Sequence, residues 1–285
     1  MDITTESIKK LRDRTGAGMM DCKRALESTG GDMDKAIEYL RKKGEAVGQK
    51  RADRAAKEGV IVTRVSPDGA TGVVVEVNCE TDFVGRSDDF VKFGGLVAGA
   101  ILAFRPTSLE QLMDLRAEGK TIAELRNDVL AKVGEKIEIR RFQVVEARGG
   151  TVSAYTHLGN KIGVLVELAG PPSAGAGIGR DVAMQVAAMS PLVVARDQIE
   201  RGIIDRELEV YKAQAKNEGK PDHILEKIAT GRLEKFYQEV CLLEQTYIKD
   251  GGKTVKDVLQ EEGQKAGTPI SVRRYFRYHL GEEVK

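Results

Sequence analysis

The chain has 285 residues, of which 41% are hydrophobic and 31% charged, a composition typical of a folded, strongly solvated protein of about two domains. Its formal charge of +1 provides no overall field that would attract nucleic acid or an anionic membrane. No apolar run approaches the roughly 18 residues of a transmembrane helix, and three dispersed cysteines argue against a disulfide framework. We therefore expect a cytoplasmic protein that recognises its partners locally.

Residues 1–45 are predicted to form a small domain of three short helices. Leu11 and Leu26 lie on the apolar faces of the first two helical segments, and Asp32 is a suitable N-cap for the third. A run of basic residues before Gly44 indicates that the third helix ends there. The core of such a short unit is necessarily small.

Two adjacent methionines, Met19 and Met20, stand out in the apolar loop 16–20 of this domain. One interpretation is that both fill the core. The other is that they form an adaptable apolar contact for a partner, a use to which flexible methionine side chains are well suited. The sequence leaves both interpretations open.

Residues 46–58 are rich in alanine and basic side chains and predict a linker. The basic residues are Lys50, Arg51, Arg54 and Lys57. They could contact RNA, although a solvated linker is the simpler interpretation.

An internal repeat follows the linker and predicts two similar α+β subdomains, residues 59–147 and 148–285. Each copy contains a β-hairpin and, later, a helix followed by a strand that carries two consecutive arginines. The hairpins are residues 60–77 and 152–168, and the helix–strand blocks are residues 121–142 and 254–275. The second copy follows the first by 91 residues in the hairpin and by 133 in the helix–strand block, which indicates an insertion in the second copy.

The insertion, at about residues 197–249, has apolar residues spaced by three and four and is interrupted by Gly219 and Pro221. This pattern predicts an antiparallel, coiled-coil-like helical hairpin that projects from the core. The apolar positions are Ile204, Leu208, Tyr211, Ala215, Leu233, Phe236, Val240 and Leu243. A projection of this kind usually serves for contact.

No pattern of catalytic or metal-binding residues is apparent. The glycines of residues 174–179 are spaced by two and fit neither a dinucleotide-binding nor a phosphate-binding loop, and the three histidines are dispersed. We therefore expect a protein that is not an enzyme and needs neither a cofactor nor a metal. The arginine pairs 140–141 and 273–274 could form a basic RNA-binding surface, but sheet-edge solvation or pairing within the chain explains them equally well.

One segment, residues 78–90, does not fit an ordinary loop. A buried strand precedes it, and a helix capped by Ser87 follows, so residues 81–86 form a strand-to-helix corner. The expected apolar face of that helix consists of Phe90, Phe93, Val97 and Phe104. Phe83 beside Asp82 could pack inward as a staple or stand out as a wedge. The second copy has Ala-Gly-Pro-Pro at the equivalent place, which favours a functional role.

Several of these segments closely resemble the bacterial elongation factor Ts family. They are residues 11–26, residues 78–90, residues 157–166 and the strands that end in Arg-Arg, and the resemblance extends over essentially the whole chain. It implies an N-terminal domain like the ubiquitin-associated three-helix fold, a core of two similar subdomains, and a helical hairpin that serves as a coiled-coil or dimerisation module. One departure is Gly85, where alanine is expected and where glycine should loosen the corner.

The resemblance also implies a function, namely catalysis of the release of guanosine diphosphate (GDP) from elongation factor Tu. The protein would bind this partner in both its GDP-bound and its nucleotide-free forms. Thr81, Asp82, Phe83 and Val84 match the family's segment linked to magnesium displacement, in which Phe83 pries apart side chains of the partner. Leu11, Met19 and Met20 match the contact that the N-terminal domain makes with the same partner. A homodimer through the hairpin is possible, whereas a membrane or nucleic-acid partner is not expected.

Overall fold

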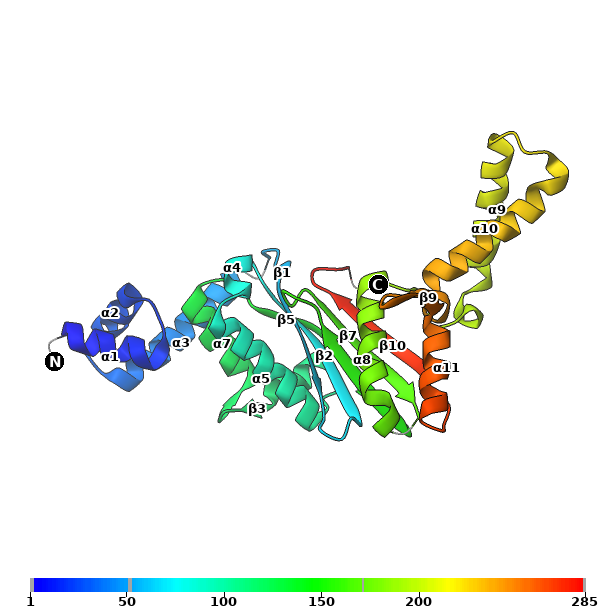
Figure 1. Ribbon diagram of the computed structural model, residues 1–285. Coiled ribbons are helices and arrows are strands. Elements are labelled where there is room, and N and C mark those ends of the chain that lie inside the picture. Colours follow the sequence, from blue (N-terminus) through cyan, green and yellow to red (C-terminus); the bar gives the residue numbers. More distant parts are fainter. Residues whose placement is uncertain (1–2, 51–52, 171, 284–285) are drawn as a thin grey trace.

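The computed structural model describes residues 3–50, 53–170 and 172–283, and its first three helices form one unit at one end of the molecule (Figure 1). These helices are α1 (Thr5–Thr15), α2 (Met19–Ser28) and α3 (Met33–Lys50). Thr4 begins α1 with a capping box, and the Asp32 carboxylate accepts the backbone N–H groups of Asp34 and Lys35 at the start of α3. The core of this unit consists of Leu11, Ala17, Cys22, Ala25, Leu26, Ala36 and Leu40.

The third helix does not end before Gly44 as expected but continues to Lys50. A Cβ atom at Gly44 would lie only 3.2 Å from the Cβ of Ala131 in α7 (Ile122–Val133), so the glycine allows two helices to pack closely. Arg41 of α3 also forms an ion pair with Glu124 of α7. The three-helix unit is thereby docked on the core through α3.

The first core unit is an antiparallel sheet in the order β1-β2-β5, with helices packed on its outer face. Its strands are β1 (Glu58–Val65), β2 (Thr71–Cys79) and β5 (Glu138–Glu146). Between β2 and β5 lie α4 (Asp82–Gly85), α5 (Asp88–Phe104), α6 (Leu109–Asp114), β3 (Arg116–Ala117), β4 (Lys120–Thr121) and α7.

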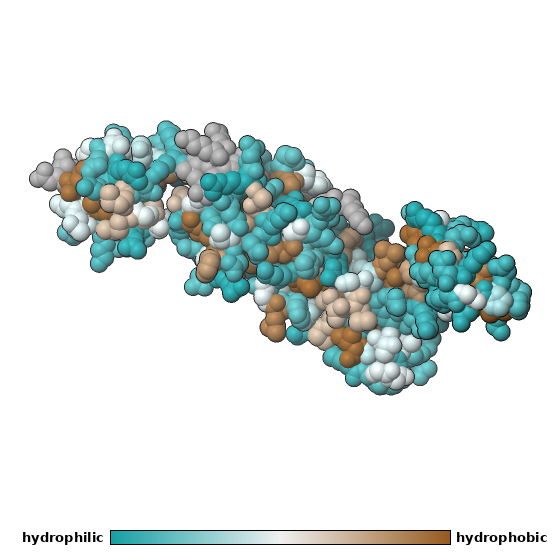
Figure 2. All heavy atoms as spheres, turned by 90° about the horizontal axis from the view of Figure 1, so that it is seen from above, coloured by the Kyte–Doolittle hydropathy of each residue, from teal (hydrophilic) through white to brown (hydrophobic). Residues whose placement is uncertain are grey.

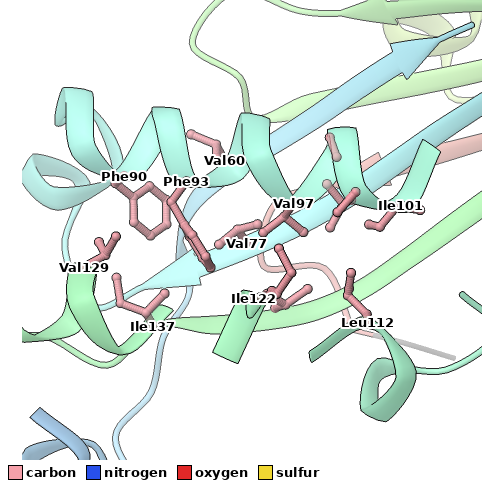
Figure 3. Close-up of a cluster of buried hydrophobic side chains, with 14 of the residues drawn as sticks. Val60, Val77, Phe90, Phe93, Val97, Ile101, Leu112, Ile122, Val129 and Ile137 are labelled. Atoms are coloured by element: carbon pink, nitrogen blue, oxygen red, sulfur yellow. The ribbon is translucent and has the colours of Figure 1, made fainter. Parts of the chain in front are cut away.

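The core of this unit lies between the sheet and α5 (Figure 3). Phe90, Phe93, Val97 and Ile101 project from α5 onto Val60 and Val77 of the sheet. Phe104 was expected on this face but is 60% exposed. It is the last residue of α5 and lies beyond Ile101, the last residue of this helix that is buried in the core.

The second core unit repeats the first, with a sheet in the order β10-β7-β6. Its strands are β6 (Gly150–Thr156), β7 (Ile162–Ala169) and β10 (Ser271–His279), and its helices are α8 (Pro172–Met189) and α11 (Val255–Lys265). Both copies of the predicted hairpin and of the helix–strand block are present, so the α+β class with small antiparallel sheets is confirmed.

The two sheets face each other in the middle of the molecule and their helices lie on the outside (Figure 1). The shared apolar layer consists of Ile61, Val74, Val145, Val152, Leu165 and Leu280. The N–H of Ile61 donates to the carbonyl of Asn160 at 2.7 Å, and the N–H of Val152 donates to the carbonyl of Gly69 at 2.8 Å. Ile61 is equivalent to Val152 in the repeat, and Gly69 is equivalent to Asn160. The two hydrogen bonds are therefore the same contact, made once from each unit to the other.

Side chains cross this interface in the same reciprocal way. A Cβ atom at Gly72 would come within 2.4 Å of Val152 Cγ1, and one at Gly163 would come within 2.4 Å of Ile61 Cγ2. Gly72 and Gly163 are equivalent residues, as are Ile61 and Val152. In each sheet, therefore, a glycine leaves room for a branched side chain from the other sheet.

Two further helices, α9 (Arg201–Asn217) and α10 (Leu225–Val240), pack against each other and extend away from the second unit (Figure 1). The Arg196 guanidinium at their base donates to Glu234 at 2.8 Å and lies over the ring of Tyr237. Leu242 and Tyr247 belong to the core of the second unit, so the projecting part is shorter than residues 197–249. Short 3-10 turns (Arg196–Gln198, Asp222–Ile224, Leu242–Glu244) and β8 (Thr246–Tyr247) with β9 (Asp250–Thr254) complete this region.

The surface seen in Figure 2 is mainly hydrophilic, with hydrophobic side chains in small groups. In the part of the chain that the structure describes, no helix is long and apolar enough to cross a membrane.

Candidate partner-binding site

The corner after β2 is built around the single-turn helix α4. Thr81 is its N-cap, and the Thr81 hydroxyl accepts the Val84 N–H at 3.5 Å. Ser87 then begins α5 as expected, but its hydroxyl donates to the Val84 carbonyl at 2.8 Å instead of capping α5. The chain therefore turns twice within a few residues.

Phe83 points away from this corner and is 84% exposed, whereas Val84 packs on the core of the first unit. An exposed phenylalanine ring gains no stability from burial in the free protein. The staple interpretation of Phe83 is therefore wrong. The ring is available for contact with another molecule.

Asp82 stands beside Phe83 and forms an ion pair with Arg86 at 3.0 Å, one turn further on. Both side chains are well exposed, at 40% and 78%, so the pair is worth little in water. The Asp82 carboxylate remains accessible as a negative charge at the tip of the corner.

Gly85 faces inward and is buried against β1. A Cβ atom there would lie 3.3 Å from the backbone N, Cα and O atoms of Gly59, which is a tight contact. Gly85 therefore permits close packing of α4 on β1, in contrast to the expected loosening of the corner.

Two glutamates that the sequence analysis did not single out connect the corner to the loop before β5. Both oxygens of Glu135 accept hydrogen bonds from Thr81, at 3.0 Å from its N–H and 2.7 Å from its hydroxyl. Glu80 in turn accepts the N–H of Lys136 at 2.7 Å. Glu135 is 54 residues from Thr81, so no local sequence pattern could have connected them.

The N-terminal candidates divide into two kinds. Met19 and Met20 lie in the first turn of α2 and are 39% and 62% exposed, so they do not fill the core. Leu11 is fully buried in that core and its side chain cannot reach a partner while the unit stays folded. Of these three candidates, Met19 and Met20 are therefore the ones available for a surface contact.

The arginine pairs are engaged within the chain. Glu76, fully buried in β2, accepts hydrogen bonds from Arg140 at 3.2 Å and Arg141 at 2.6 Å. This arrangement recurs at Glu167 of β7, where the donors are the second pair, residues 273 and 274. Arg54 of the predicted linker likewise pairs with Glu80 at 2.9 Å. Intramolecular pairing thus explains arginines that could otherwise form an RNA-binding surface.

The one cysteine next to the corner, Cys79, is not an activated nucleophile. The Cys79 thiol, fully buried just before the corner, has its pKa raised to about 12 by burial and by the charge of Glu135, so it stays protonated at neutral pH. Among the described residues, no group of three or more His, Cys, Asp or Glu side chains could hold a metal ion. The corner presents to solvent the apolar ring of Phe83 and the adjacent charge of Asp82.

Comparison with known proteins assigns this architecture to the translation elongation factors. The model of the "Elongation factor TS" family matches residues 80–282, which include the corner from Glu80 onward, β5 of the first sheet, the whole second sheet and the projecting helices. The chain belongs to the elongation factor Ts family.

Curated relatives match the chain over almost its full length. The elongation factor Ts of Prosthecochloris aestuarii is 48% identical over 98% of this chain and 99% of its own length. That of Chloroherpeton thalassium is 47% identical over 99% of both chains. That of Clostridium perfringens is 43% identical over 99% of this chain and 94% of its own.

Proposed function

We propose that this protein is a guanine-nucleotide exchange factor that promotes GDP release from elongation factor Tu during translation elongation. A protein that binds the nucleotide-free partner more tightly than the GDP-bound partner weakens GDP binding by the same coupling free energy. The observation that carries the proposal is Phe83, an 84% exposed aromatic ring on a helix anchored at both ends.

The corner acts on the magnesium ion and on the side chains around the partner's nucleotide. Magnesium bridges phosphate and protein in such sites and is among the largest local charges there, so its displacement removes much of the hold on GDP. Phe83 is the wedge that separates partner side chains, and Asp82 supplies the adjacent charge. Thr81 and Val84 hold these two residues in place through the N-cap and the core contact.

The three-helix unit contributes affinity through Met19 and Met20. Their exposure and the flexibility of methionine support an apolar contact with the partner's nucleotide-binding domain. Leu11 supports this contact indirectly, because it holds α1 and α2 together in the core. We also propose that the unit is a ubiquitin-associated-like domain, which its three helices and the family resemblance support.

Exchange of this kind requires binding energy alone. We accordingly propose a cytoplasmic, non-enzymatic protein that needs no cofactor or metal of its own and has no membrane or direct nucleic-acid partner. The helices α9 and α10 form the coiled-coil module, used for self-association or for a second contact with the partner. The RNA-binding alternative is weakened because Arg54 and the arginine pairs already bind glutamates.

The deciding experiment is stopped-flow release of a fluorescent GDP from purified elongation factor Tu, with and without this protein. Release that accelerates and saturates with the concentration of the protein supports the proposal. An unchanged release rate, with RNA retarded in a gel by the protein at moderate salt, would establish the alternative instead.

A further inference from the structure

We propose that Glu135 is a positioning residue for exchange, which holds the α4 corner in its active conformation through Thr81; this rests on the function proposed above. The Glu135 carboxylate accepts both polar hydrogens of Thr81, from the backbone N–H at 3.0 Å and from the hydroxyl at 2.7 Å. One side chain from the loop before β5 therefore fixes the backbone and the rotamer of the residue that caps α4.

The hydroxyl of Thr81 connects Glu135 to the helix itself. As it donates its hydrogen to Glu135, its oxygen lone pairs are directed to the other side, where they accept the Val84 N–H. A helix of a single turn has almost no stability of its own, because nucleation costs more than one hydrogen bond returns. The orientation of Asp82 and Phe83 thus depends on anchors outside α4.

The connection between the two loops is reciprocal. While Glu135 binds the N–H of Thr81, Glu80 accepts the N–H of Lys136 at 2.7 Å, so each loop caps the backbone of the other. Glu80 also accepts from Arg54 at 2.9 Å, and the Lys136 ammonium donates to the Arg54 carbonyl at 3.2 Å. Three segments of the chain meet where β2 ends.

The repeat provides an independent argument for a functional role. At the positions of Glu80 and Glu135 the second copy has Pro171 and Thr268, and it also lacks the Asp-Phe pair. Both copies fold into the same three-stranded sheet, so the fold does not require these glutamates. They occur only in the copy that carries the corner.

We assign the effect of Glu135 to Thr81, because each of its two oxygens accepts a hydrogen bond from that residue. Without Glu135, the corner must become ordered each time it binds the partner. The free-energy cost of this ordering is added to the step in which Phe83 enters the partner. We expect Glu135→Ala to lower the maximal GDP release rate at saturating protein by about tenfold. The half-saturating concentration should stay within about twofold, because Met19 and Met20 are untouched.

A double-mutant cycle tests whether Glu135 acts through the corner. In the background Asp82→Asn with Phe83→Ala, Glu135→Ala should change the release rate less than twofold, since the residues that it positions are gone. Glu118→Ala, which removes an exposed glutamate paired with Lys92 at 3.4 Å, is the matched control and should behave as wild type. A tenfold loss that persists in the double-mutant background would overturn the proposal.

Amide hydrogen exchange on the free protein separates this inference from the proposed function. Glu135→Ala should accelerate exchange at Thr81, whose N–H Glu135 accepts, and at residues 84–86, while the amides of β2 and α5 keep their protection. If the wild-type protein does not accelerate GDP release from elongation factor Tu, the proposed function is wrong. These amides still show whether Glu135 holds the corner in place. Equal exchange at Thr81 and at residues 84–86 in Glu135→Ala and wild type would disprove the positioning role of Glu135.

Variants of Thr81 provide a second measurement if Glu135→Ala proves unstable. Thr81→Val keeps the branched shape but removes the hydroxyl that Glu135 binds, and should reproduce the loss in maximal rate. Thr81→Ser restores the hydroxyl and should recover most of the wild-type rate. Equal rates for the valine and serine variants would overturn the proposal.

Discussion

Glu76 of β2 and Glu167 of β7 are equivalent residues of the repeat, and each is buried against two consecutive arginines of the neighbouring strand. Each also accepts a backbone N–H from the segment that follows the last strand of the other sheet. Gly281, after β10, donates to Glu76 at 2.9 Å, and Arg148, after β5, donates to Glu167 at 3.4 Å. The two carboxylates therefore fasten strand pairs and, at the same time, join the two units.

This arrangement predicts acid sensitivity. Burial alone would raise the pKa of Glu167, but hydrogen bonds from Arg274 and the Arg148 N–H and the charges of Arg274 and Arg273 outweigh it, so the pKa lies below its ordinary value of 4.5. The ion pair therefore stabilises the fold at pH values above 4.5, and this contribution is lost as the pH falls through the lower folded pKa.

Glu167→Gln should accordingly lower the free energy of unfolding at about pH 7, and its difference from wild type should shrink towards about pH 3. Urea unfolding at a series of pH values measures this difference. Glu118→Gln, at an exposed position, is the control and should show little loss at any pH. A difference for Glu167→Gln that is constant with pH would contradict the assignment.

Phe83→Ala should slow GDP release by about 10- to 100-fold, for about 1.4 to 3 kcal/mol of lost ring burial in the complex. The thermal melting of the free variant should match wild type, because the ring is 84% exposed. Stopped-flow release and calorimetry together measure both quantities. A wild-type release rate, or a variant that merely unfolds, would rule out the wedge.

Asp82→Asn should have a smaller effect than Phe83→Ala, and the effect should diminish when magnesium is scarce, because it acts through charge near the displaced ion. The substitution also breaks the ion pair with Arg86. Arg86→Gln is the matched control, since it breaks the same pair and keeps the carboxylate. Release measured at several magnesium concentrations should separate the two variants, and identical behaviour would assign the effect to the ion pair.

Replacing both Met19 and Met20 by alanine should raise the concentration needed for half-maximal exchange, by about 1 to 3 kcal/mol in free energy. The maximal rate should change little, because a remote apolar contact binds ground and transition states alike. Leu11→Ala provides the contrast, since it should destabilise the three-helix unit by about 2 to 5 kcal/mol. Melting of the methionine variant like that of Leu11→Ala would show that the methionines support the fold.

Replacing residues 201–240 by a short Gly/Ser linker should leave the two sheets folded and alter self-association or a second contact with the partner. The replaced segment ends before Cys241 and Leu242, which are fully buried. Light scattering and far-ultraviolet circular dichroism check the two outcomes. An insoluble product would mean that α9 and α10 are needed by the core, and unchanged self-association would place the dimer contact elsewhere.

The repeat was predictable from the sequence because alternating valines, Gly-containing turns and the Arg-Arg strands occur twice in the same order. The end of α3 was not, because Gly44 usually signals a helix end, whereas here it provides room for Ala131. Phe104 continues the apolar spacing of α5 but lies past the edge of the core. Local patterns thus predict elements better than the packing between them.

The residues of the candidate site could be predicted from the sequence, but the contacts that hold them in place could not. Asp82 and Phe83 stood out because one copy of the repeat has them and the other does not. Burial separates Leu11 from Met19 and Met20, a distinction that spacing alone does not make. The bond from Thr81 to Glu135 joins residues far apart in sequence, so only the folded chain reveals it.

Because the two sheets pack reciprocally, the same kind of contact occurs twice in one molecule. Gly72 and Gly163 face Val152 and Ile61 across one interface, so the same substitution can be made twice in nearly identical surroundings. A matched loss of stability measures the shared geometry. A mismatch measures how far the two halves differ around these glycines, where one faces a valine and the other an isoleucine.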